Sequence, residues 1–531
     1  VILFTSNLGS LRHRSFVPCS GRRGRRLVAA HARPAMLLAV AAAAAAAVAL
    51  AASAARITSL PGYRGTAADF PVMEAGYTNI TNGKHLYYWF FETFADDKAN
   101  APLVVWFQGG PGCSSLFGMF SENGPLTLTA DGGVERNYVN WVNYAHVLYF
   151  EQPVGVGFSV ADDPSYYNGS DLRAAADSAA FLQQWLVDHP RYRQSRLWLT
   201  GESYGGVYLP TTADVVINST IGAQLAGLML GNPVISCADV DDSPRRPGAP
   251  EAGNTVALNM LYWHGLVSYE SYQRWRALAC NDDARSDSCA ALWKKIVAQV
   301  GDIEQPLLAA ADDDNYPALN PDDLYYSFCT GNGTLDFAVT RADSQCSPTT
   351  TRITKYLNRA DVQRAIHVQF APLPQKWASC WNRLTNWTQD AGSMIPFVER
   401  LFERRPDVNV LYFSGDVDIL TVPFGFTHEC LSQLANRGQR TRAWQPWRVN
   451  RHVAGYWEQF EKYTYATIKG AGHEAPGYQP LTSSEMFRRF LQTGSLADKA
   501  PLARAARRTG PPRDRRLWTQ ATVLKMLNIR P

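Results

Sequence analysis

The chain has 531 residues, of which 46% are hydrophobic and 18% are charged. That composition can bury a large core, and it excludes a mainly disordered or collagen-like chain. The formal net charge of +4 is unevenly spread, because residues 1–68 contribute +9 and residues 497–531 contribute +7. Subtracting both ends leaves −12 for residues 69–496, and such an acidic body argues against nucleic acid as the main partner.

The first element is an alanine-rich apolar stretch over residues 36–55, which ends in Ala52-Ser53-Ala54-Ala55. An apolar run that ends in small residues is typical of a secretory signal peptide, so we expect cleavage after Ala54 or Ala55. A membrane anchor is the alternative, since about 20 apolar residues can cross a bilayer. Contact with a membrane is therefore expected only if this segment stays uncleaved. Residues 1–35 are either an extended start of the signal or upstream sequence.

Two further features favour the secretory pathway. The chain has five Asn-X-Ser/Thr glycosylation sequons, at Asn79, Asn168, Asn218, Asn332 and Asn386. It has nine cysteines, of which Cys19 precedes the expected cleavage site, and none forms a Cys-X-X-Cys pattern. The even number that is left favours disulfides in an oxidising compartment, so we expect an extracellular, lysosomal or vacuolar protein. No Cys/His spacing typical of a metal site occurs, so we expect no metal and no cofactor.

Six short apolar runs, bounded by Gly, Pro or Asn, predict buried parallel strands: 103–107, 147–150, 197–199, 225–230, 408–413 and 463–468. Helical patterns lie at 172–188 and 485–491. Strands that alternate with helices indicate a parallel sheet covered on both faces. Between Cys237 and Cys346 the pattern changes to acidic loops and short helices, at 267–279 and 289–300, which predicts an insertion that caps the sheet.

The chain therefore divides into five parts. Residues 1–55 are the upstream segment and signal peptide, 56–235 and 347–496 are two parts of one core, and 236–346 are the cap. Residues 497–531 form a basic tail that we expect to be disordered.

A candidate nucleophile follows the third predicted strand, in Gly201-Glu-Ser203-Tyr-Gly205. A Gly-X-Ser-X-Gly sequence between a strand and a helix predicts a sharp turn that exposes the serine hydroxyl above the sheet. We expect Gly201 and Gly205 to allow close approach of neighbouring backbone.

A serine nucleophile needs a base and an orienting acid, which in this arrangement come later in the chain, each beyond a strand. The run 408–413 leads to Asp416 and Asp418, and the run 463–468 leads to His473. Both aspartates could instead be turn residues, and the histidine could be a structural loop residue. Three such groups in the required order favour the catalytic interpretation.

Five motifs together carry a family resemblance: Phe107–Ser115, Glu151–Ser159, Gly201–Gly206, Ser414–Asp418 and Gly470–Pro476. Over residues 60–495 the chain resembles the serine carboxypeptidases. The resemblance implies an α/β-hydrolase fold, with a mostly parallel central sheet, helices on both faces and a mainly helical cap insertion. It also implies a serine-type carboxypeptidase activity on the C-termini of peptides or proteins at acidic pH.

The resemblance implies a role for each catalytic residue. Ser203 is similar in place to the family nucleophile, His473 to the base, and Asp418, rather than Asp416, to the orienting carboxylate. The backbone N–H groups of Gly110 and Tyr204 match the oxyanion hole.

Recognition of the substrate carboxylate is implied for a second group: Trp106, Gln108, Gly109, Glu202 and its carboxyl partner Glu122. Two close carboxyls resist double ionisation, which accounts for an acidic working range. Position 108 is more commonly Asn in the family, so the longer Gln108 changes the expected grip. Glu474 matches a position that faces the leaving residue and would favour C-terminal Lys or Arg.

Disulfides are implied in the same way. Cys113–Cys380 matches a family bridge, and Cys280–Cys289 and Cys329–Cys346 match local bridges of the insertion. Cys237 and Cys430 are left over, and their pairing stays open.

Two other functions are open at this point. Plant relatives of these peptidases transfer acyl groups with the same triad, but here Glu202 and Gly205-Gly206 keep the peptidase form. A non-catalytic stabilising partner is the other alternative, and the intact triad argues against it as the only role. The sequence does not indicate an oligomeric state, and a homodimer is compatible with it.

Overall fold

The computed structural model describes residues 56–237, 253–280, 286–300, 322–325, 349–369, 375–419 and 421–497. All of them belong to one compact unit, Ala54–Pro531. The expected signal segment, the tail beyond residue 497, Asn332, Cys329 and Cys346 lie outside the described residues. None of the described helices is both long and apolar enough to span a membrane.

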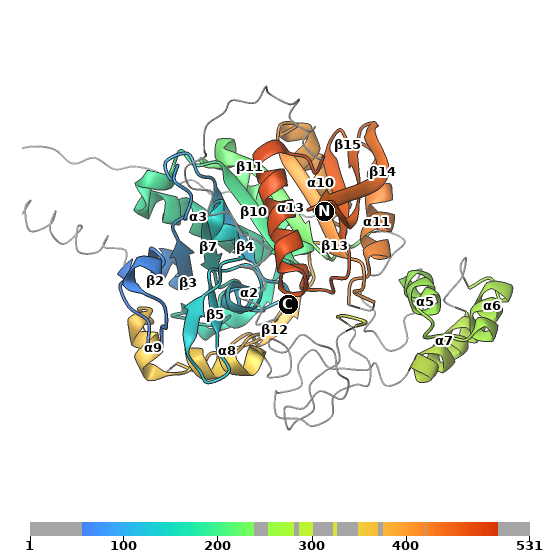
Figure 1. Cartoon of the computed structure of the whole chain (residues 1–531), viewed down its shortest axis with the longest axis horizontal. Helices are drawn as coiled ribbons and strands as arrows, with labels where there is room; N and C mark the ends of the chain where they lie inside the picture. Colours follow the sequence, from blue (N-terminus) through green and yellow to red (C-terminus); the bar gives the residue numbers. More distant parts are fainter. Residues whose placement is uncertain are drawn as a thin grey trace, which may run out of the picture. The chain divides into compact units, whose positions relative to one another are not determined.

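The core is a twelve-stranded sheet whose six central strands are parallel (Figure 1). In spatial order they are β7 (His146–Phe150), β4 (Leu103–Phe107), β10 (Leu197–Glu202), β11 (Leu225–Gly231), β13 (Asn409–Gly415) and β16 (Tyr463–Ile468). These are the six predicted runs, with small differences at their ends. Both faces of these strands are covered, which explains their continuous apolar sequences.

Antiparallel strands extend the sheet at both edges, so the sheet as a whole is mixed. On the β7 side they are β3 (Lys84–Phe91), β2 (Met73–Ile80), β1 (Arg56–Ile57) and β8 (Val160–Ala161); on the β16 side they are β15 (His452–Phe460) and β14 (Arg440–Val449). The prediction of a mostly parallel sheet therefore describes its centre. Strand β3 is almost wholly buried and β14 is largely exposed, so neither shows a clear alternation.

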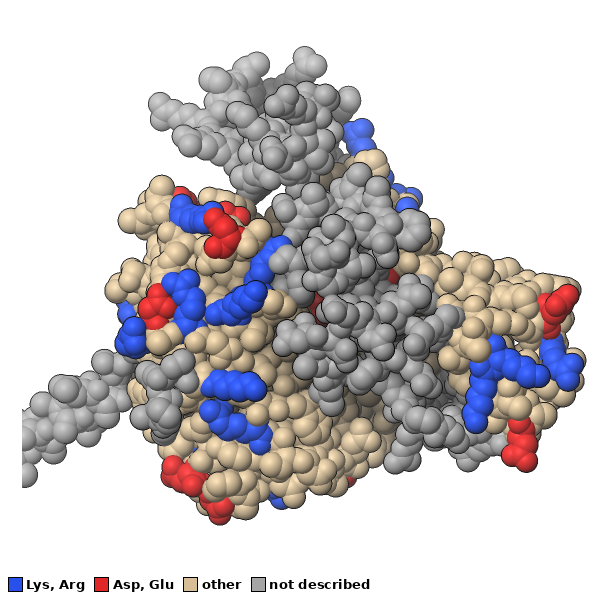
Figure 2. All heavy atoms as spheres, turned by 90° about the horizontal axis from the view of Figure 1, so that it is seen from below, with Lys and Arg blue, Asp and Glu red and all other residues tan. Residues whose placement is uncertain are grey.

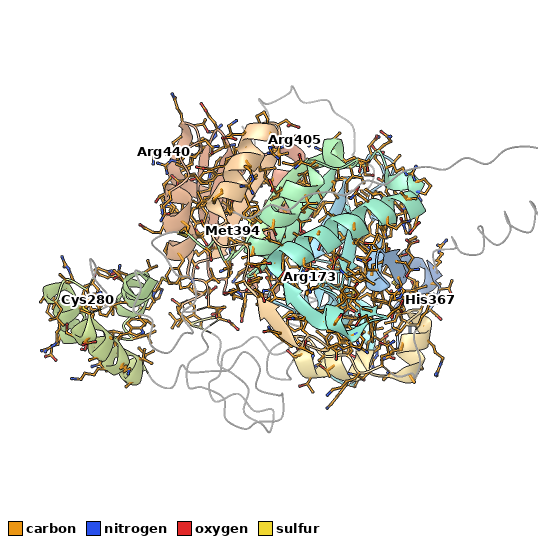
Figure 3. All side chains as sticks on the ribbon, turned by 180° about the vertical axis from the view of Figure 1, so that it is seen from behind. Arg173, Cys280, His367, Met394, Arg405 and Arg440 are labelled. Atoms are coloured by element: carbon orange, nitrogen blue, oxygen red, sulfur yellow. A yellow bond between two sulfur atoms is a disulfide. The ribbon has the colours of Figure 1, made fainter. Side chains whose placement is uncertain are left out.

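Alternate side chains of each central strand face two separate hydrophobic cores. In β4, Leu103, Val105 and Phe107 belong to one core, and Val104 and Trp106 belong to the other. The first core is covered by α3 (Asp171–Asp188), α4 (Gly205–Val216) and α10 (Ile395–Arg404); the second is covered by α2 (Ser115–Ser121), α12 (Ala475–Tyr478) and α13 (Pro480–Thr493). Figure 1 shows α13 in front of the sheet, and Figure 3 shows Arg173, on α3, from the opposite side.

The remaining elements are short. The helices are α8 (Thr349–Leu357), α9 (Ala360–Ala365) and α11 (Phe424–Ser432), and the strand pairs are β5 (Leu126–Leu128) with β6 (Val134–Arg136) and β9 (Asn168–Ser170) with β12 (Asn386–Thr388). The described part of the predicted insertion contains α5 (Gly253–Trp263), α6 (Tyr269–Ala277) and α7 (Asp287–Val300). The last two match the predicted helices of the cap, whereas α5 was not predicted.

Three disulfides are formed by described residues: Cys113–Cys380, Cys280–Cys289 and Cys237–Cys430. The first two are pairs that the resemblance implies. The third joins the two cysteines whose pairing the sequence left open, and it ties the end of the first core segment to α11.

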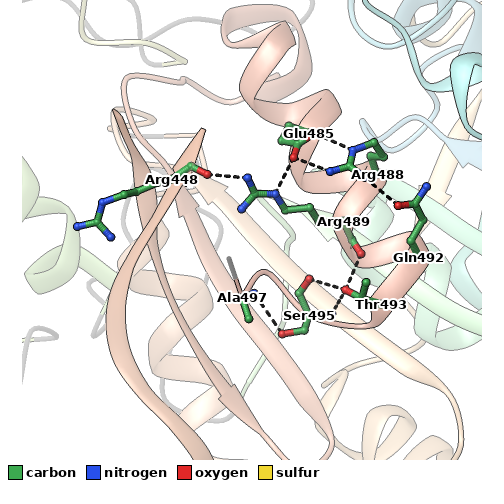
Figure 4. A network of polar contacts seen from close by, with 8 residues as sticks. All are labelled: Arg448, Glu485, Arg488, Arg489, Gln492, Thr493, Ser495 and Ala497. Carbon is green, nitrogen blue, oxygen red and sulfur yellow. Dashed lines mark hydrogen bonds and ion pairs between the residues drawn. The ribbon is translucent and has the colours of Figure 1, made fainter. Parts of the chain in front are cut away.

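The C-terminal helix α13 is fixed to the outer hairpin by a polar network (Figure 4). Glu485 accepts hydrogen bonds from Arg488 and Arg489, both at 2.7 Å. Arg489 also donates to the backbone carbonyl of Arg448, at the end of β14, over 2.7 Å. The network therefore connects α13 to β14, which is the outermost strand on this side of the sheet within the described residues.

Part of the negative charge of the body lies inside the molecule. The buried acids among the described residues are Glu92, Glu122, Glu151, Asp171, Glu202, Asp323, Asp418 and Glu458, whereas Lys84 is the one buried Lys or Arg there. The face seen in Figure 2 carries basic and acidic side chains together. The formal charge of −12 therefore overstates how acidic the surface is, and several acids must have shifted pKa values.

Candidate active site

Ser203 lies in the turn between β10 and α4. Its φ is +55°, a left-handed conformation that is strained for serine and typical of a nucleophile at such a turn. The turn is held from both sides, since the Ser203 amide donates to Gly231 O (3.0 Å) and the Val234 amide donates to Ser203 O (2.9 Å).

Close contacts require glycine at two positions of the turn, but only one of them is a predicted position. A Cβ added to Gly201 would lie 2.4 Å from the carbonyl oxygen of Phe107, as expected. A Cβ on Gly205 would meet only ordinary contacts, at 3.4 Å or more, whereas one on Gly206 would lie 2.2 Å from Val234 O. The close approach predicted at Gly205 is therefore wrong, and the crowded position is the next residue.

The three expected triad residues follow neighbouring strands. Strands β10, β11, β13 and β16 are adjacent in the sheet, and Ser203, Asp418 and His473 come after the carboxyl ends of the first, third and fourth. Ligands bind at this edge in open α/β sheets, because the loops there converge on one crevice.

His473 and Asp418 are joined directly. His473 Nδ1 lies 2.6 Å from Asp418 Oδ2, and both side chains are buried. This contact fixes one ring nitrogen and leaves Nε2 for a proton from a nucleophile. Among the described residues Ser203 Oγ makes no hydrogen bond to His473, and such contacts are often longer before substrate binds.

Asp418 is surrounded by donors that the sequence analysis did not single out. Asn232 Nδ2 donates to Oδ2 over 2.9 Å, and the amides of Thr421 and Val422 donate over 3.0 and 3.1 Å. Donors of this kind stabilise the ionised carboxylate. Asn232 directly follows β11, so a polar residue at a strand's carboxyl end was the signal that could have identified it.

The pKa values of the pair reflect burial and mutual attraction. Burial lowers the pKa of His473, but the Asp418 carboxylate, with Asp322 and Glu474, raises it by more, so the net pKa is above its usual value. Burial raises the pKa of Asp418, and His473 opposes that rise. Asp416 lies beside the pair but holds the loop instead, since its Oδ1 accepts from the Gly470 amide over 2.6 Å.

The expected oxyanion loop passes against the nucleophile turn. A Cβ added to Gly109 would lie 2.6 Å from Ser203 Cβ and 2.8 Å from the Tyr204 nitrogen, so only glycine fits there. Gly110 follows with φ +118°. The two expected N–H donors, of Gly110 and Tyr204, therefore belong to segments that touch beside the serine.

Tyr204 is anchored by a buried network that the sequence did not reveal. Its hydroxyl donates to Asp171 Oδ1 over 2.8 Å, and Trp387 Nε1 donates to the same oxygen over 3.0 Å. Asp171 begins α3, and Trp387 lies 216 residues later, so this contact depends on the fold. The network fixes the residue whose amide is an expected oxyanion donor.

A carboxyl pair lies on the other side of the turn. Gln108 Nε2 donates to Glu202 Oε1 over 2.6 Å and to Glu122 Oε1 over 3.1 Å, and Trp106 Nε1 donates to Gln108 Oε1 over 2.8 Å. All three polar residues are at most 4% exposed. Both amide protons of Gln108 are used, so in this geometry it reaches a ligand only through the carboxyl pair.

The pair has strongly perturbed pKa values. Burial, followed by repulsion from Glu122, raises the pKa of Glu202 well above its usual value, and burial raises that of Glu122. The Oε2 atom of each carboxyl is buried without a partner. Because two neighbouring carboxylates cannot easily both ionise, one proton on the pair would supply the missing donor.

Glu474, next to His473, is half-buried. Burial raises its pKa to about 8, with Glu122 and Asp322 adding to the rise. At mildly acidic pH this side chain is therefore neutral.

Elsewhere on the surface, four sequon asparagines, Asn79, Asn168, Asn218 and Asn386, are exposed. Within the described residues, no group of His, Cys, Asp or Glu side chains could hold a metal ion.

A sequence model of the serine carboxypeptidase family matches residues 61–493. The chain belongs to the serine carboxypeptidase family. Serine carboxypeptidase-like 25 of Arabidopsis thaliana is 34% identical to it over 461 residues, which cover 83% of this chain and 91% of that protein. Serine carboxypeptidase-like 36 of the same plant is 30% identical over 440 residues, covering 80% and 83%.

A solved structure supports the same fold. The prohormone-processing carboxypeptidase Kex1(delta)p from Saccharomyces cerevisiae superposes with a TM-score of 0.61 at 19% identity, covering 82% of this chain and 94% of that chain. The chain thus has an α/β-hydrolase fold, and the family resemblance of its motifs is confirmed.

Proposed function

We propose that this chain is a serine carboxypeptidase, which hydrolyses the last peptide bond of peptides or proteins through an acyl-enzyme on Ser203. The observation that carries the proposal is the Glu122–Glu202 pair, joined through Gln108 and lying next to the nucleophile turn. A buried acid pair that shares a proton is suited to bind a free carboxylate, and an endopeptidase has no need of one.

In the first step, Ser203 Oγ attacks the carbonyl carbon of the last peptide bond, and His473 Nε2 takes the hydroxyl proton. The Gly110 and Tyr204 amides donate to the oxyanion that forms. His473, held by Asp418, then gives the proton to the departing amine, which leaves as a free amino acid. Water attacks the ester by the same route in reverse, which releases the shortened peptide and frees Ser203.

The leaving residue would be recognised through its carboxylate. The protonated member of the Glu122–Glu202 pair donates to one carboxylate oxygen, and the backbone amide of Gly109 is a second donor near it. Trp106 and Gln108 support this pair rather than contact the substrate. Above the pKa of the pair, two carboxylates would face a third, so binding weakens as the pH rises.

The charge of Glu474 matters for side-chain preference. Because its pKa is raised to about 8, a preference for C-terminal Lys or Arg should emerge only as the pH approaches that value. We also infer that the protein enters the secretory pathway, where the exposed sequon asparagines would be glycosylated and the disulfides would form.

The test uses protein expressed from Met36 in a secretory host, with Ser203→Ala as the control. Each is incubated near pH 5 with an N-blocked dipeptide and with its C-terminal amide. We expect release of the C-terminal amino acid from the free acid, at least 10-fold slower release from the amide, and none from the variant.

The relatives are named serine carboxypeptidase-like, so acyl transfer is the alternative to test in parallel. If glycosylated, folded wild type releases nothing but reacts with a fluorophosphonate at Ser203, the carboxypeptidase proposal fails and acyl transfer from an activated ester takes its place. Absence of labelling as well would contradict a working triad.

A further inference from the structure

The insertion contributes a short segment to the active site. Residues Asp322–Tyr325 lie between the loop after β13 and the loop after β16. The His473 amide donates to the carbonyl oxygen of Asp322 over 2.8 Å, and the Leu324 amide donates to that of Val417 over 3.1 Å. These two loops carry His473 and Asp418, so this tetrapeptide is hydrogen-bonded to both loops.

Side chains strengthen the same connection. Thr421 Oγ1 donates to Asp322 Oδ1, and the Thr421 amide donates to Asp418 Oδ1 over 3.0 Å. Thr421 therefore links the insertion to the carboxylate that orients His473. Tyr325 closes the segment, because its amide donates to Asp323 Oδ1 over 2.8 Å and makes a tight Asx turn.

Asp323 packs closely against Gly472, the residue before His473. Its side chain is 1% exposed, and its Oδ2 has no hydrogen-bond partner. A Cβ added to Gly472 would lie 2.6 Å from Asp323 Cβ, 2.7 Å from Asp323 Oδ2 and 2.3 Å from Asp322 O. Only glycine allows this contact, so a shift of the segment would move the backbone at position 472 and His473 with it.

We propose that Asp322–Tyr325 is a positioning segment, in which Asp323 fixes the place of His473 relative to Asp418. The inference rests on the proposed use of His473 as the base. It assigns a part in the chemistry to the region that the sequence predicts to be an insertion. Asp323 touches no reacting atom in this account and acts through the loop of His473.

The electrostatics agree with a neutral side chain at this place. Burial raises the pKa of Asp323 to about 7, and repulsion from Asp418, Asp322 and Asp416 adds to the rise. On the other side, the loop after β16 presents His473 and Glu474, which both interact with Asp322. At mildly acidic pH Asp323 is therefore uncharged, and asparagine should reproduce its shape and charge.

The test compares Asp323→Ala and Asp323→Asn in the full chain. The readouts are kcat and KM at pH 5 and the rate at which a fluorophosphonate labels Ser203. Because small misplacements of a catalytic group are costly, we expect D323A to lower kcat and the labelling rate about 10-fold or more, with KM within about 2-fold. D323N should return both rates to within about 3-fold of wild type.

Asp214→Ala is the matched control for general loss of stability. Asp214 pairs with Arg400 over 3.0 and 3.1 Å, about 16 Å along α4 from Ser203, so D214A should lose stability but keep kcat. Thr421→Val is a second variant. It removes the side-chain hydrogen bond to Asp322 and keeps the hydrogen bond from the backbone amide of residue 421 to Asp418. It should lower kcat about 3-fold or more with unchanged KM.

Four results would overturn the inference: wild-type rates in D323A, no recovery in D323N, an equal loss of kcat in D214A, or wild-type kcat in T421V. If D323A does not fold, the rates of D323N and T421V are sufficient to test the inference. The labelling rate separates this inference from the proposed function. Unlabelled wild type contradicts the function, whereas equal labelling of wild type and D323A contradicts only the positioning role.

Discussion

Gln108 and Glu202 are joined by a 2.6 Å hydrogen bond, in which the amide Nε2 donates to the carboxyl Oε1. The same nitrogen donates to Glu122, so one side chain holds both members of the acid pair. The extra methylene of glutamine, compared with the asparagine more common in the family, lets the amide lie between them. Gln108, the residue that departs from the more common asparagine, therefore holds the Glu122–Glu202 pair together.

Shortening this side chain should weaken binding of the substrate carboxylate. In Gln108→Asn the amide is drawn back by about 1.5 Å and cannot reach both carboxyls, and a hydrogen bond to a charged or buried carboxyl contributes about 1.5–3 kcal/mol. We expect KM for an N-blocked dipeptide to rise about 10-fold, with kcat within about 3-fold. The C-terminal amide of that peptide is the control substrate, and its slow turnover should not change. An unchanged KM for the free acid would contradict the role given to Gln108.

Removing the titration of Glu202 should remove the pH dependence of binding. The raised pKa means that the wild-type pair loses its shared proton as the pH rises, so KM for the free acid increases. Glu202→Gln keeps a donor at all pH values, so its KM should stay nearly constant from pH 4.5 to 8. At pH 4.5 it should lie within about 3-fold of wild type.

The control for this experiment is Glu485→Gln, in the polar network on α13, which should keep the wild-type rise of KM with pH. An equally steep rise in E202Q would show that another group titrates, and Glu474, with a pKa raised to about 8, would then be the first to test.

The sequence predicted the centre of the sheet well and its edges poorly. The six central strands are buried on both faces, so each appears as a continuous apolar run that stands out from its surroundings. The edge strands are determined by their neighbours: β14 is exposed over much of its length and pairs with β15 through several register shifts. Local composition carries little information about such a strand.

Similar limits apply to the site. Ser203, Asp418 and His473 could be singled out as candidates because each follows a predicted strand on a loop bounded by glycine. Asn232 was missed although it also follows a predicted strand, because nothing nearby marks it as a partner of Asp418, 186 residues later. Asp323 was hidden in an acidic loop of the insertion, where its burial could not be foreseen.

The Cys113–Cys380 disulfide should support both stability and catalysis. It closes 267 residues of chain, for which a simple chain-entropy model gives about 5.6 kcal/mol. It also fixes the expected oxyanion loop, beside a backbone hydrogen bond from Trp381 to Gly112 O of 2.8 Å. In C113S/C380S we expect a lower Tm and a fall in kcat of about 10-fold, with a smaller change in KM.

The control is C280S/C289S, which opens a bridge over 9 residues inside the insertion. Its loss of stability should be about half as large, since the entropy of loop closure grows with the logarithm of loop length. It should keep kcat. If both double variants lose the same fraction of kcat, the first disulfide has no particular role in placing the oxyanion loop.

The buried acids should make the folded protein less stable as the pH rises. Burial raises the pKa of Glu151 and Asp323 to about 7 and that of Glu474 to about 8, while Glu202 also has a raised pKa. Between the ordinary carboxyl pKa and these values, the folded state binds more protons than the unfolded state. The free energy of unfolding therefore falls as the pH increases, by about 1.4 kcal/mol for each unit of pKa shift.

We thus expect Tm to be highest near pH 5 and to decline steadily towards pH 8, measured in one buffer series at constant ionic strength. Glu474→Gln removes the carboxyl whose pKa is raised to about 8, so the Tm of this variant should decline less steeply over the same range. Because unfolding then releases fewer protons, the wild-type and variant curves should converge at low pH and diverge above pH 5. Parallel curves, or a wild-type Tm that rises from pH 5 to 8, would mean that these carboxyls are ionised in the folded protein.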